Sequence, residues 1–333
     1  MKKKVSLSIL LISSILTGII TFVMLTTFWK EEPSNQIPIT QNCDNTMSQT
    51  RLKEYSLIEP LILTDIYNES ASLIELKTKI DQYVNLKKSK QEADDVSVYF
   101  RKLNDGSWFN ISPNTTYNPA SMSKLIELIT YLKEAEENPE ILEKKIFFPR
   151  HFTQVSAQNI KDFQLKEKVS YTVRDLLTYM IKYSDNDATI LLNLNINMRI
   201  YNQLFLDLKI PAPPTNGEYF ITAADFSKFF RVLYNATYLR PKYSEWGLRL
   251  LTTSTFKEGL QKGVDSTTVM AHKFGERILG NKIQFHEFGI VYINDNPYLI
   301  GVMTKGASLN QLIEIVAEIS RITYLEYKTN IDN

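Results

Sequence analysis

The chain of 333 residues is 44% hydrophobic and 23% charged, the composition of an ordinary globular protein that can bury a sizeable core. Its formal net charge of +1, with no basic stripe, argues against a nucleic-acid partner. The single cysteine, Cys43, excludes an intramolecular disulfide. The three histidines, His151, His272 and His286, are far apart in sequence; they predict neither a metal site nor a cofactor, and we interpret them as structural.

The N-terminus predicts a membrane anchor. Residues 5–29 carry no charge, and as a helix at about 1.5 Å per residue they would span about 37 Å, more than the roughly 30 Å bilayer core. Three lysines at positions 2–4 predict that residues 1–4 stay in the cytoplasm. Because no A-x-A-like cleavage site follows, we favour an uncleaved signal anchor over a cleaved signal peptide. We therefore expect a single-pass protein of the cell membrane whose remaining chain lies outside the cytoplasm.

A tether is expected next, over residues 30–60. Residues 31–50 are polar and contain prolines, without hydrophobic periodicity. Cys43 lies well past the apolar run and follows two polar residues, which argues against lipid attachment. A helical pattern follows at 72–91, and two β-rich runs then flank Asn104-Asp105-Gly106, a strong hairpin signal.

A mostly helical block is expected from 121 to 244. Two helices are expected to begin with a threonine and an aspartate three residues later, Thr172 with Asp175 and Thr222 with Asp225, which is typical of a capping box. The clearest helical segments are 123–137, 172–184 and 222–239, with a further candidate at 244–263.

The chain then becomes β-rich again, with strands expected at 267–276, 284–293 and 297–306 and a last helix at 308–327. Two strands, a helical block, three strands and a helix predict an α/β (α+β) fold with a five-stranded antiparallel sheet flanked by helices. One domain would cover 61–333. Its sheet part would be 61–120 and 245–333, with the helical part 121–244 inserted between them.

Three short motifs could carry chemistry, and both their order and their context matter. The three motifs are Ser121-Met122-Ser123-Lys124 at a helix start, Ser184-Asp185-Asn186 after a helix, and Lys273-Phe274-Gly275 in a strand. Each motif is weak alone, and further S-x-x-K and K-x-G matches at 254–257 and 257–259 stand in the wrong order. Together the three motifs resemble S-x-x-K, S-D-N and K-T-G, the signature of class A β-lactamases and penicillin-binding proteins.

The stretches around these motifs extend the likeness. Residues 100–124, 184–192 and 221–235 are similar to the hairpin before the serine, the helix after S-D-N and a later T-x-x-D helix of class A enzymes. Over about 72–324 the chain resembles a membrane-anchored member of the serine β-lactamase and penicillin-binding protein superfamily. The resemblance implies that fold, and a substrate that is either a small-molecule β-lactam or a peptidoglycan-like peptide.

The spacing of Ser121 and Lys124 fits nucleophilic catalysis. Residues three apart share a helix face, and a helix start favours developing negative charge. Lys124 can take the proton of Ser121 only when neutral, and burial together with a nearby cation, Lys273, would lower its pKa. Lys273 would also attract a substrate carboxylate.

Four further groups complete the expected site. Ser184 would relay the proton to the leaving nitrogen, and Asn186 would hydrogen-bond the catalytic lysine and the substrate amide. The backbone N–H groups of Ser121 and Glu276 would form the oxyanion hole. Gly275 would leave room for the close approach of a substrate.

Two departures from the family pattern bear on function. Phe274 stands at the substrate-binding position where the family has Thr or Ser, and a phenyl ring cannot bind a carboxylate. The glutamate that activates the deacylating water in class A enzymes also has no equivalent. Residues 209–220 hold a single acid, Glu218, which we interpret as an exposed turn acid rather than a surrogate base.

These observations favour a β-lactamase-like serine hydrolase that forms an acyl-enzyme at Ser121 on β-lactams or peptide-like amides outside the membrane. Without the glutamate the acyl-enzyme would hydrolyse slowly. A DD-peptidase or transpeptidase-type penicillin-binding protein is therefore an alternative. A non-catalytic ligand-binding protein with the same fold is another, and the sequence leaves the oligomeric state open.

Overall fold

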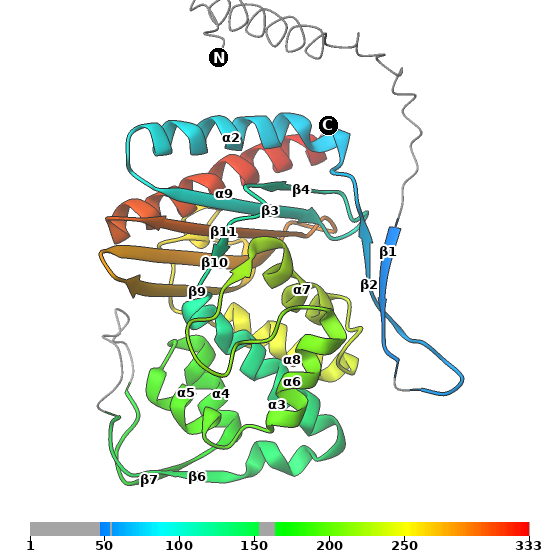
Figure 1. The fold of residues 1–333 in the computed structure, drawn as a ribbon, viewed down its shortest axis with the longest axis vertical. Helices are drawn as coiled ribbons and strands as arrows, with labels where there is room; N and C mark the ends of the chain where they lie inside the picture. The colour runs from blue at the N-terminus through cyan, green and yellow to red at the C-terminus, as the bar shows by residue number, and fades with distance from the viewer. Residues whose placement is uncertain (1–46, 54, 153–163, 333) are drawn as a thin grey trace, which may run out of the picture. The chain divides into compact units, whose positions relative to one another are not determined.

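A sheet of five antiparallel strands forms the centre of the described domain, in the order β4-β3-β11-β10-β9 (Figure 1). The computed structural model describes residues 47–53, 55–152 and 164–332. The sheet confirms the predicted five-stranded arrangement, with the β3–β4 hairpin at Asn104-Asp105-Gly106. Its strands are β3 (Asp95–Lys102), β4 (Trp108–Ile111), β9 (Val269–Leu279), β10 (Lys282–Tyr292) and β11 (Tyr298–Gly306).

Two helices cover one face of the sheet, as Figure 1 shows. They are α2 (Ile74–Ser89), preceded by the 3-10 turn η1 (Ala71–Leu73), and α9 (Leu309–Asp332). Buried residues recur every four positions in α2, so one stripe of the helix joins α9 and the inner strands in a hydrophobic cluster. The two helices correspond to those predicted at 72–91 and 308–327.

The helical part covers the opposite face (Figure 1). It packs through a second hydrophobic cluster to which α3 and α7 contribute many of the largest buried side chains. Among the described residues its α-helices are α3 (Lys124–Glu137), α4 (Val173–Lys182), α5 (Asn186–Asn193), α6 (Met198–Leu208), α7 (Ala223–Tyr234) and α8 (Pro241–Thr252). Short elements join them: η2 (Ala120–Ser123), η3 (Pro139–Glu143), β5 (Thr116–Tyr117) paired with β8 (Ile221–Thr222), and β6 (Lys145–Phe148) paired with β7 (Val169–Thr172).

Side-chain caps fix where the key helices begin. Thr172 Oγ1 accepts a hydrogen bond from Asp175 N at 3.0 Å, and Thr172 N donates back to Asp175 Oδ2 at 3.2 Å. This is the predicted capping box of α4, worth about 1 kcal/mol. Asp185 caps α5 in a similar way, accepting from Ala188 N at 2.7 Å. The Asp185 cap places the S-D-N motif in the tight connection between α4, which ends at Lys182, and α5.

The helix expected at 244–263 ends early. α8 stops at Thr252, and only a 3-10 turn, η4 (Leu260–Gly263), follows. Thr253 Oγ1 donates to a backbone carbonyl of α8 at 2.7 Å, and Thr255 N donates to the carbonyl of Lys182 at 3.0 Å. Such local bonds compete with helix propagation. The second S-x-x-K match at 254–257 therefore lies in a loop, and α8 also crosses the expected domain limit at 244.

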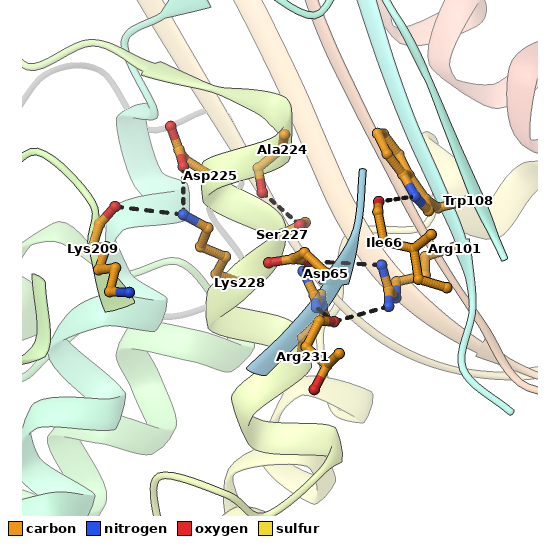
Figure 2. Close-up of polar contacts among 11 residues, drawn as sticks. Asp65, Ile66, Arg101, Trp108, Lys209, Ala224, Asp225, Ser227, Lys228 and Arg231 are labelled. Atoms are coloured by element: carbon orange, nitrogen blue, oxygen red, sulfur yellow. Dashed lines mark hydrogen bonds and ion pairs between the residues drawn. The ribbon is translucent and has the colours of Figure 1, made fainter. Parts of the chain in front are cut away.

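A hairpin of β1 (Met47–Arg51) and β2 (Leu61–Ile66) joins the domain through buried charge. Asp65 on β2 forms an ion pair with Arg231 of α7 at 2.6 Å and lies 3.8 Å from Arg101 of β3 (Figure 2). Trp108 Nε1 donates to Ile66 O at 2.8 Å. Five residues of the predicted tether thus form a strand instead, because an ordered partner strand lies beside them.

The predicted cytoplasmic tail (1–4), the anchor (5–29), Cys43 and most of the tether lie outside the described residues. Of the helices within 47–53, 55–152 and 164–332, none combines the length and apolar character needed to cross a bilayer.

Candidate active site

Ser121 lies in the 3-10 turn η2, which leads directly into α3. Ala120 before it has a left-handed backbone with φ of 50°, which is uncommon outside glycine. Ala120 N donates to Asn118 Oδ1 at 2.8 Å, and Asn118 N donates to Gln284 Oε1 at 3.0 Å. The nucleophile candidate therefore sits in a constrained turn tied to β10, and the helix start is 3-10 rather than α.

Lys124, the first residue of α3, is only 2% exposed. Its Nζ donates to Ser184 O at 2.6 Å, to Ser184 Oγ at 3.1 Å and to Asn186 Oδ1 at 2.8 Å. These three acceptors match the three donors of an ammonium group. An ammonium group has no free lone pair, so Lys124 must lose a proton before it can accept the one on Ser121.

The Ser184 hydroxyl lies between two lysines. Lys124 Nζ donates to it at 3.1 Å, and Lys273 Nζ donates to it at 3.0 Å. Ser184 is 4% exposed and, like Ala120, has a left-handed backbone, with φ of 54°. Non-glycine residues hold this conformation only where their surroundings enforce it, and such residues cluster at functional sites.

Lys273 enters the site from β9, the edge strand of the sheet, and is fully buried. Its Nζ also donates to Phe274 O at 2.9 Å. Four of the predicted site residues, Lys124, Ser184, Asn186 and Lys273, are thus brought together from α3, the α4–α5 connection and β9.

Burial lowers the pKa of Lys124 to about 8, although the charges of Glu127 and Asp185 partly oppose the shift. Burial also holds the pKa of Lys273 well below its usual value, and the charge of Lys124 lowers it further. The electrostatic coupling between two neighbouring amines is reciprocal, so the lowering of the Lys124 pKa by Lys273 stays a prediction. A lysine with a pKa near 8 is suited to act as a base near neutral pH.

Gly275 is required by the protein itself. A Cβ at this position would lie 2.5 Å from Pro119 O and 2.9 Å from Met122 N, closer than real Cβ atoms approach. The backbone of β9 therefore packs directly on the turn that carries Ser121. Gly275 thus makes room for this turn, and its expected role in the close approach of a substrate stays a prediction. Glu276, the next residue, is consequently placed beside this turn, and its part in an oxyanion hole stays a prediction.

The Phe274 side chain belongs to the hydrophobic core. Its ring stacks on Phe256 with the centres 4.3 Å apart, and on Phe285 at 6.3 Å, and the residue is 8% exposed. Lys273 Nζ lies 4.2 Å from the centre of the same ring. The assignment of Phe274 to the substrate-binding residues therefore fails for its side chain, which instead shields the Lys273 amine from water.

Glu218 is engaged by two neighbours. Its carboxylate accepts a hydrogen bond from Asn118 Nδ2 and forms an ion pair with Arg277 of β9. It therefore ties the loop 209–220 to the turn before Ser121 and to the strand after Gly275. Glu218 is exposed, as expected of a turn acid, but its carboxylate is held by protein partners.

Polar contacts of β10 were missed by the sequence analysis. Thr304 N donates to His286 Nδ1 at 3.1 Å, so the ring proton is on Nε2, which lies 3.2 Å from Gln284 Oε1. Burial lowers the pKa of His286 to about 3, so the ring is neutral. Gln284 in turn accepts from Asn118 N, and no sequence motif marks this support of the Ser121 turn.

The other histidines also have protein partners. His151 Nδ1 lies 2.6 Å from Asp187 Oδ2, and His272 Nδ1 lies 2.6 Å from Glu287 Oε1. Within the part of the chain that the structure describes, no three His, Cys, Asp or Glu residues are grouped as a metal site.

The architecture defines the class of protein. The five-stranded antiparallel sheet has helices on both faces, and the S-x-x-K turn lies beside its edge strand β9. The S-D-N connection contacts both the turn's lysine and this strand's lysine. Together these features define the serine β-lactamase fold. The sequence profile of the beta-lactamase enzyme family matches residues 75–327, most of the chain, and the protein belongs to this family. No curated protein matches the sequence.

Solved structures share the fold at low sequence identity. PBP-A is 20% identical with a TM-score of 0.64, over 77% of this chain and 97% of that chain. The TLA-3 extended-spectrum beta-lactamase is 17% identical with a TM-score of 0.67, over 76% and 98%. A beta-lactamase from Chitinophaga pinensis is 17% identical with a TM-score of 0.64, over 75% and 99%. These likenesses establish the fold alone.

Proposed function

We propose that this protein is a serine acyl-transfer hydrolase that forms an acyl-enzyme at Ser121 on β-lactams or peptide-like amides. The observation that carries the proposal is the Ser184 hydroxyl, held at 3.1 Å from Lys124 Nζ and 3.0 Å from Lys273 Nζ. Burying an amine lowers the stability of the fold, so stability does not explain two buried amines that share one hydroxyl. Proton transfer between them and the substrate does explain the arrangement.

In the proposed reaction neutral Lys124 accepts the proton of Ser121, and Ser121 Oγ attacks the carbonyl carbon of the amide. The backbone N–H groups of Ser121 and Glu276 stabilise the oxyanion that develops. The proton then passes from Lys124 through Ser184 to the leaving nitrogen. Lys273 orients the Ser184 hydroxyl by its hydrogen bond, and Asn186 orients Lys124.

Within this class we favour slow release of the acyl group, as in a DD-peptidase or transpeptidase-type penicillin-binding protein. Glu218 is the one acid of residues 209–220, and Asn118 and Arg277 engage its carboxylate. This loop therefore offers no free carboxylate to activate water. A mutant of PBP-A was solved as an acyl-enzyme complex with penicillin G, the kind of complex that we expect here.

A pulse of penicillin G followed by intact-mass spectrometry tests the proposal. We expect one adduct on the wild-type protein that persists for hours, and none on Ser121→Ala. Ser254→Ala, in the second S-x-x-K match, is the matched control and should be labelled like wild type. Labelling of Ser121→Ala would disprove the assignment of the nucleophile, and loss of the adduct within seconds would favour an efficient β-lactamase.

A non-catalytic ligand-binding protein is the second candidate. Phe274 favours it, because its buried ring removes the hydroxyl that the family uses to bind a substrate carboxylate. Folded wild-type protein that reacts with neither penicillin nor any other active-site serine reagent would support this alternative.

We also propose that the active site lies outside the cell membrane, held there by residues 5–29. The uncharged run and the preceding lysines support this location. Protease added to intact spheroplasts should digest the domain, and protection of the domain would contradict the proposal.

A further inference from the structure

Glu127 is a buried acid to which the proposed reaction assigns no task. It lies on α3 three residues after Lys124 and is 5% exposed. Residues three apart on a helix are neighbours, with roughly 5–6 Å between Cβ atoms. Asn193 Nδ2 of α5 donates to Glu127 Oε1 at 3.2 Å, whereas Oε2 is buried without a hydrogen-bond partner among the described residues.

The charges around Lys124 leave Glu127 as the available counter-charge. Lys124 and Lys273 are 2% and 0% exposed, so both amines are removed from water. Asp185 is occupied as the N-cap of α5, and Glu287 of β10 is paired with His272 at 2.6 Å. Glu127 keeps one carboxylate oxygen uncommitted, and a buried cation needs a counter-charge.

We propose that Glu127 is a positioning residue whose negative charge keeps Lys124 basic and compensates the ammonium formed when Lys124 takes the Ser121 proton. This inference rests on the acyl-transfer reaction proposed above. In that step the Ser121 O–H bond breaks and its proton binds Lys124 Nζ. The electron pair of Oγ forms the bond to the substrate carbonyl carbon, whose π electrons move to the carbonyl oxygen. An anion one helical turn away lowers the cost of the new buried charge.

The electrostatic directions show how the two groups act on each other. Burial lowers the pKa of Lys124, and the charge of Glu127 partly opposes this shift. Burial raises the pKa of Glu127 above its ordinary value, and the hydrogen bond from Asn193 and the charges of Lys124 and Lys273 offset only part of the rise. Tyr201 of α6 also faces this acid, and burial followed by the charge of Glu127 raises its pKa. Removing the negative charge should therefore lower the pKa of Lys124.

Glu127→Gln tests the inference, because it keeps the acceptor for Asn193 and removes only the charge. In protein labelled with lysine carrying ¹⁵N at Nζ, NMR titration should show the Lys124 pKa lower than in wild type by roughly one unit. The acid limb of acylation by penicillin G should move to lower pH by the same amount. The plateau rate should fall about tenfold, because a weaker base transfers the proton more slowly.

Two further variants complete the design. Glu137→Gln, at the exposed end of α3, is the matched control and should leave the Lys124 pKa and the acylation rate unchanged. Asn193→Ala removes the donor to Glu127 and should shift the Lys124 pKa in the same direction by less. If Glu127→Gln fails to fold, the Lys124 pKa measured in Asn193→Ala tests the inference instead.

An unchanged Lys124 pKa in both variants, or an equal loss of acylation at every pH, would overturn the inference. The titration needs no reaction, so the two proposals can fail separately. A wild-type protein that penicillin does not acylate, but whose Lys124 pKa falls in Glu127→Gln, would contradict the proposed function and support the inference.

Discussion

At the scale of single residues, the site depends on backbone conformations that the residues themselves disfavour. Ala120 and Ser184 have φ of 50° and 54°, and a left-handed residue other than glycine costs about 1–2 kcal/mol. Asn118 holds the first through its hydrogen bond to Ala120 N, and Lys124 holds the second through Ser184 O. The backbone of the turn before Ser121 and that of Ser184 are therefore both held by neighbouring side chains.

Gly275→Ala should disturb the nucleophile without touching it. The added Cβ would lie 2.5 Å from Pro119 O, so η2 or β9 must shift. We expect a loss of about 1–3 kcal/mol in the free energy of unfolding and at least about a tenfold loss in acylation rate. Denaturant titration and the mass-spectrometric pulse measure the two effects.

Gly280→Ala is the control for this variant. It has open space around the new Cβ, although φ of 61° makes the substitution mildly strained. It should keep the wild-type acylation rate. Equal acylation by the two alanine variants would contradict the role given to the Gly275 contact.

The pH dependence of wild-type acylation should follow Lys124. Burial lowers the pKa of Lys124 to about 8, and only the neutral amine can take the serine proton. The rate constant should therefore fall about tenfold per pH unit below that pKa and level off above it. Rapid-mixing measurements between pH 6 and pH 10 check this, and a flat profile would exclude Lys124 as the base.

At the scale of elements, polar contacts bind the loop 209–220 to the turn and strand that flank the active site. Glu218 joins this loop to Asn118 and to Arg277 of β9. The bonds lie on either side of the contact between η2 and Gly275, so the loop braces that contact. Its acid therefore stabilises the site without taking part in the chemistry that we propose.

Glu218→Gln should leave the lifetime of the penicillin adduct within about twofold of wild type and lower the free energy of unfolding by about 1 kcal/mol. Glu245→Gln, which loses an exposed ion pair with Arg249, is the control and should change stability by less than about 0.5 kcal/mol. An adduct that lasts at least ten times longer in Glu218→Gln would identify Glu218 as the deacylating base.

The elements also show how far sequence reasoning reaches. Strands β9 to β11 could be predicted because apolar runs alternate with turn residues, and the motif order placed Lys124, Ser184 and Lys273 in one site. β1 could not be predicted, because its polar residues form a strand only beside β2. The sequence also could not predict on which side of β9 Phe274 lies, because this depends on strand register and on contact with Phe256 from a distant loop.

At the scale of the whole molecule, the β1–β2 hairpin contributes to stability at a place apart from the chemistry. Asp65 neutralises Arg231, which is 4% exposed, and Arg101 lies within 3.8 Å of the same carboxylate. Removing one partner of such a pair leaves an uncompensated buried charge. The contacts of Asp65 and Ile66 described above reach α7, β3 and β4 rather than Ser121.

A variant that begins at Ser70, and so lacks the hairpin, should melt roughly 5–10 °C below a variant that begins at Met47, because it leaves Arg231 without Asp65. Both variants should be acylated by penicillin at the same rate. Asp65→Asn should reproduce about half of the loss in melting temperature. A truncated protein that melts like its control would show that the hairpin does not stabilise the domain.

The hydrogen bonds of the Ser184 hydroxyl depend on the alignment of the helical part with the sheet. Lys124 reaches it from the helical part and Lys273 from the sheet, and both bonds are near 3 Å. If the helical part moved by about 1 Å relative to the sheet, one of these two hydrogen bonds would break while each hydrophobic cluster stayed intact. Displacements of that size can lower the reaction rate about a hundredfold. On heating or in mild denaturant, the acylation rate should therefore fall well before the domain unfolds. The loss of activity would then be the first sign that the helical part has moved relative to the sheet.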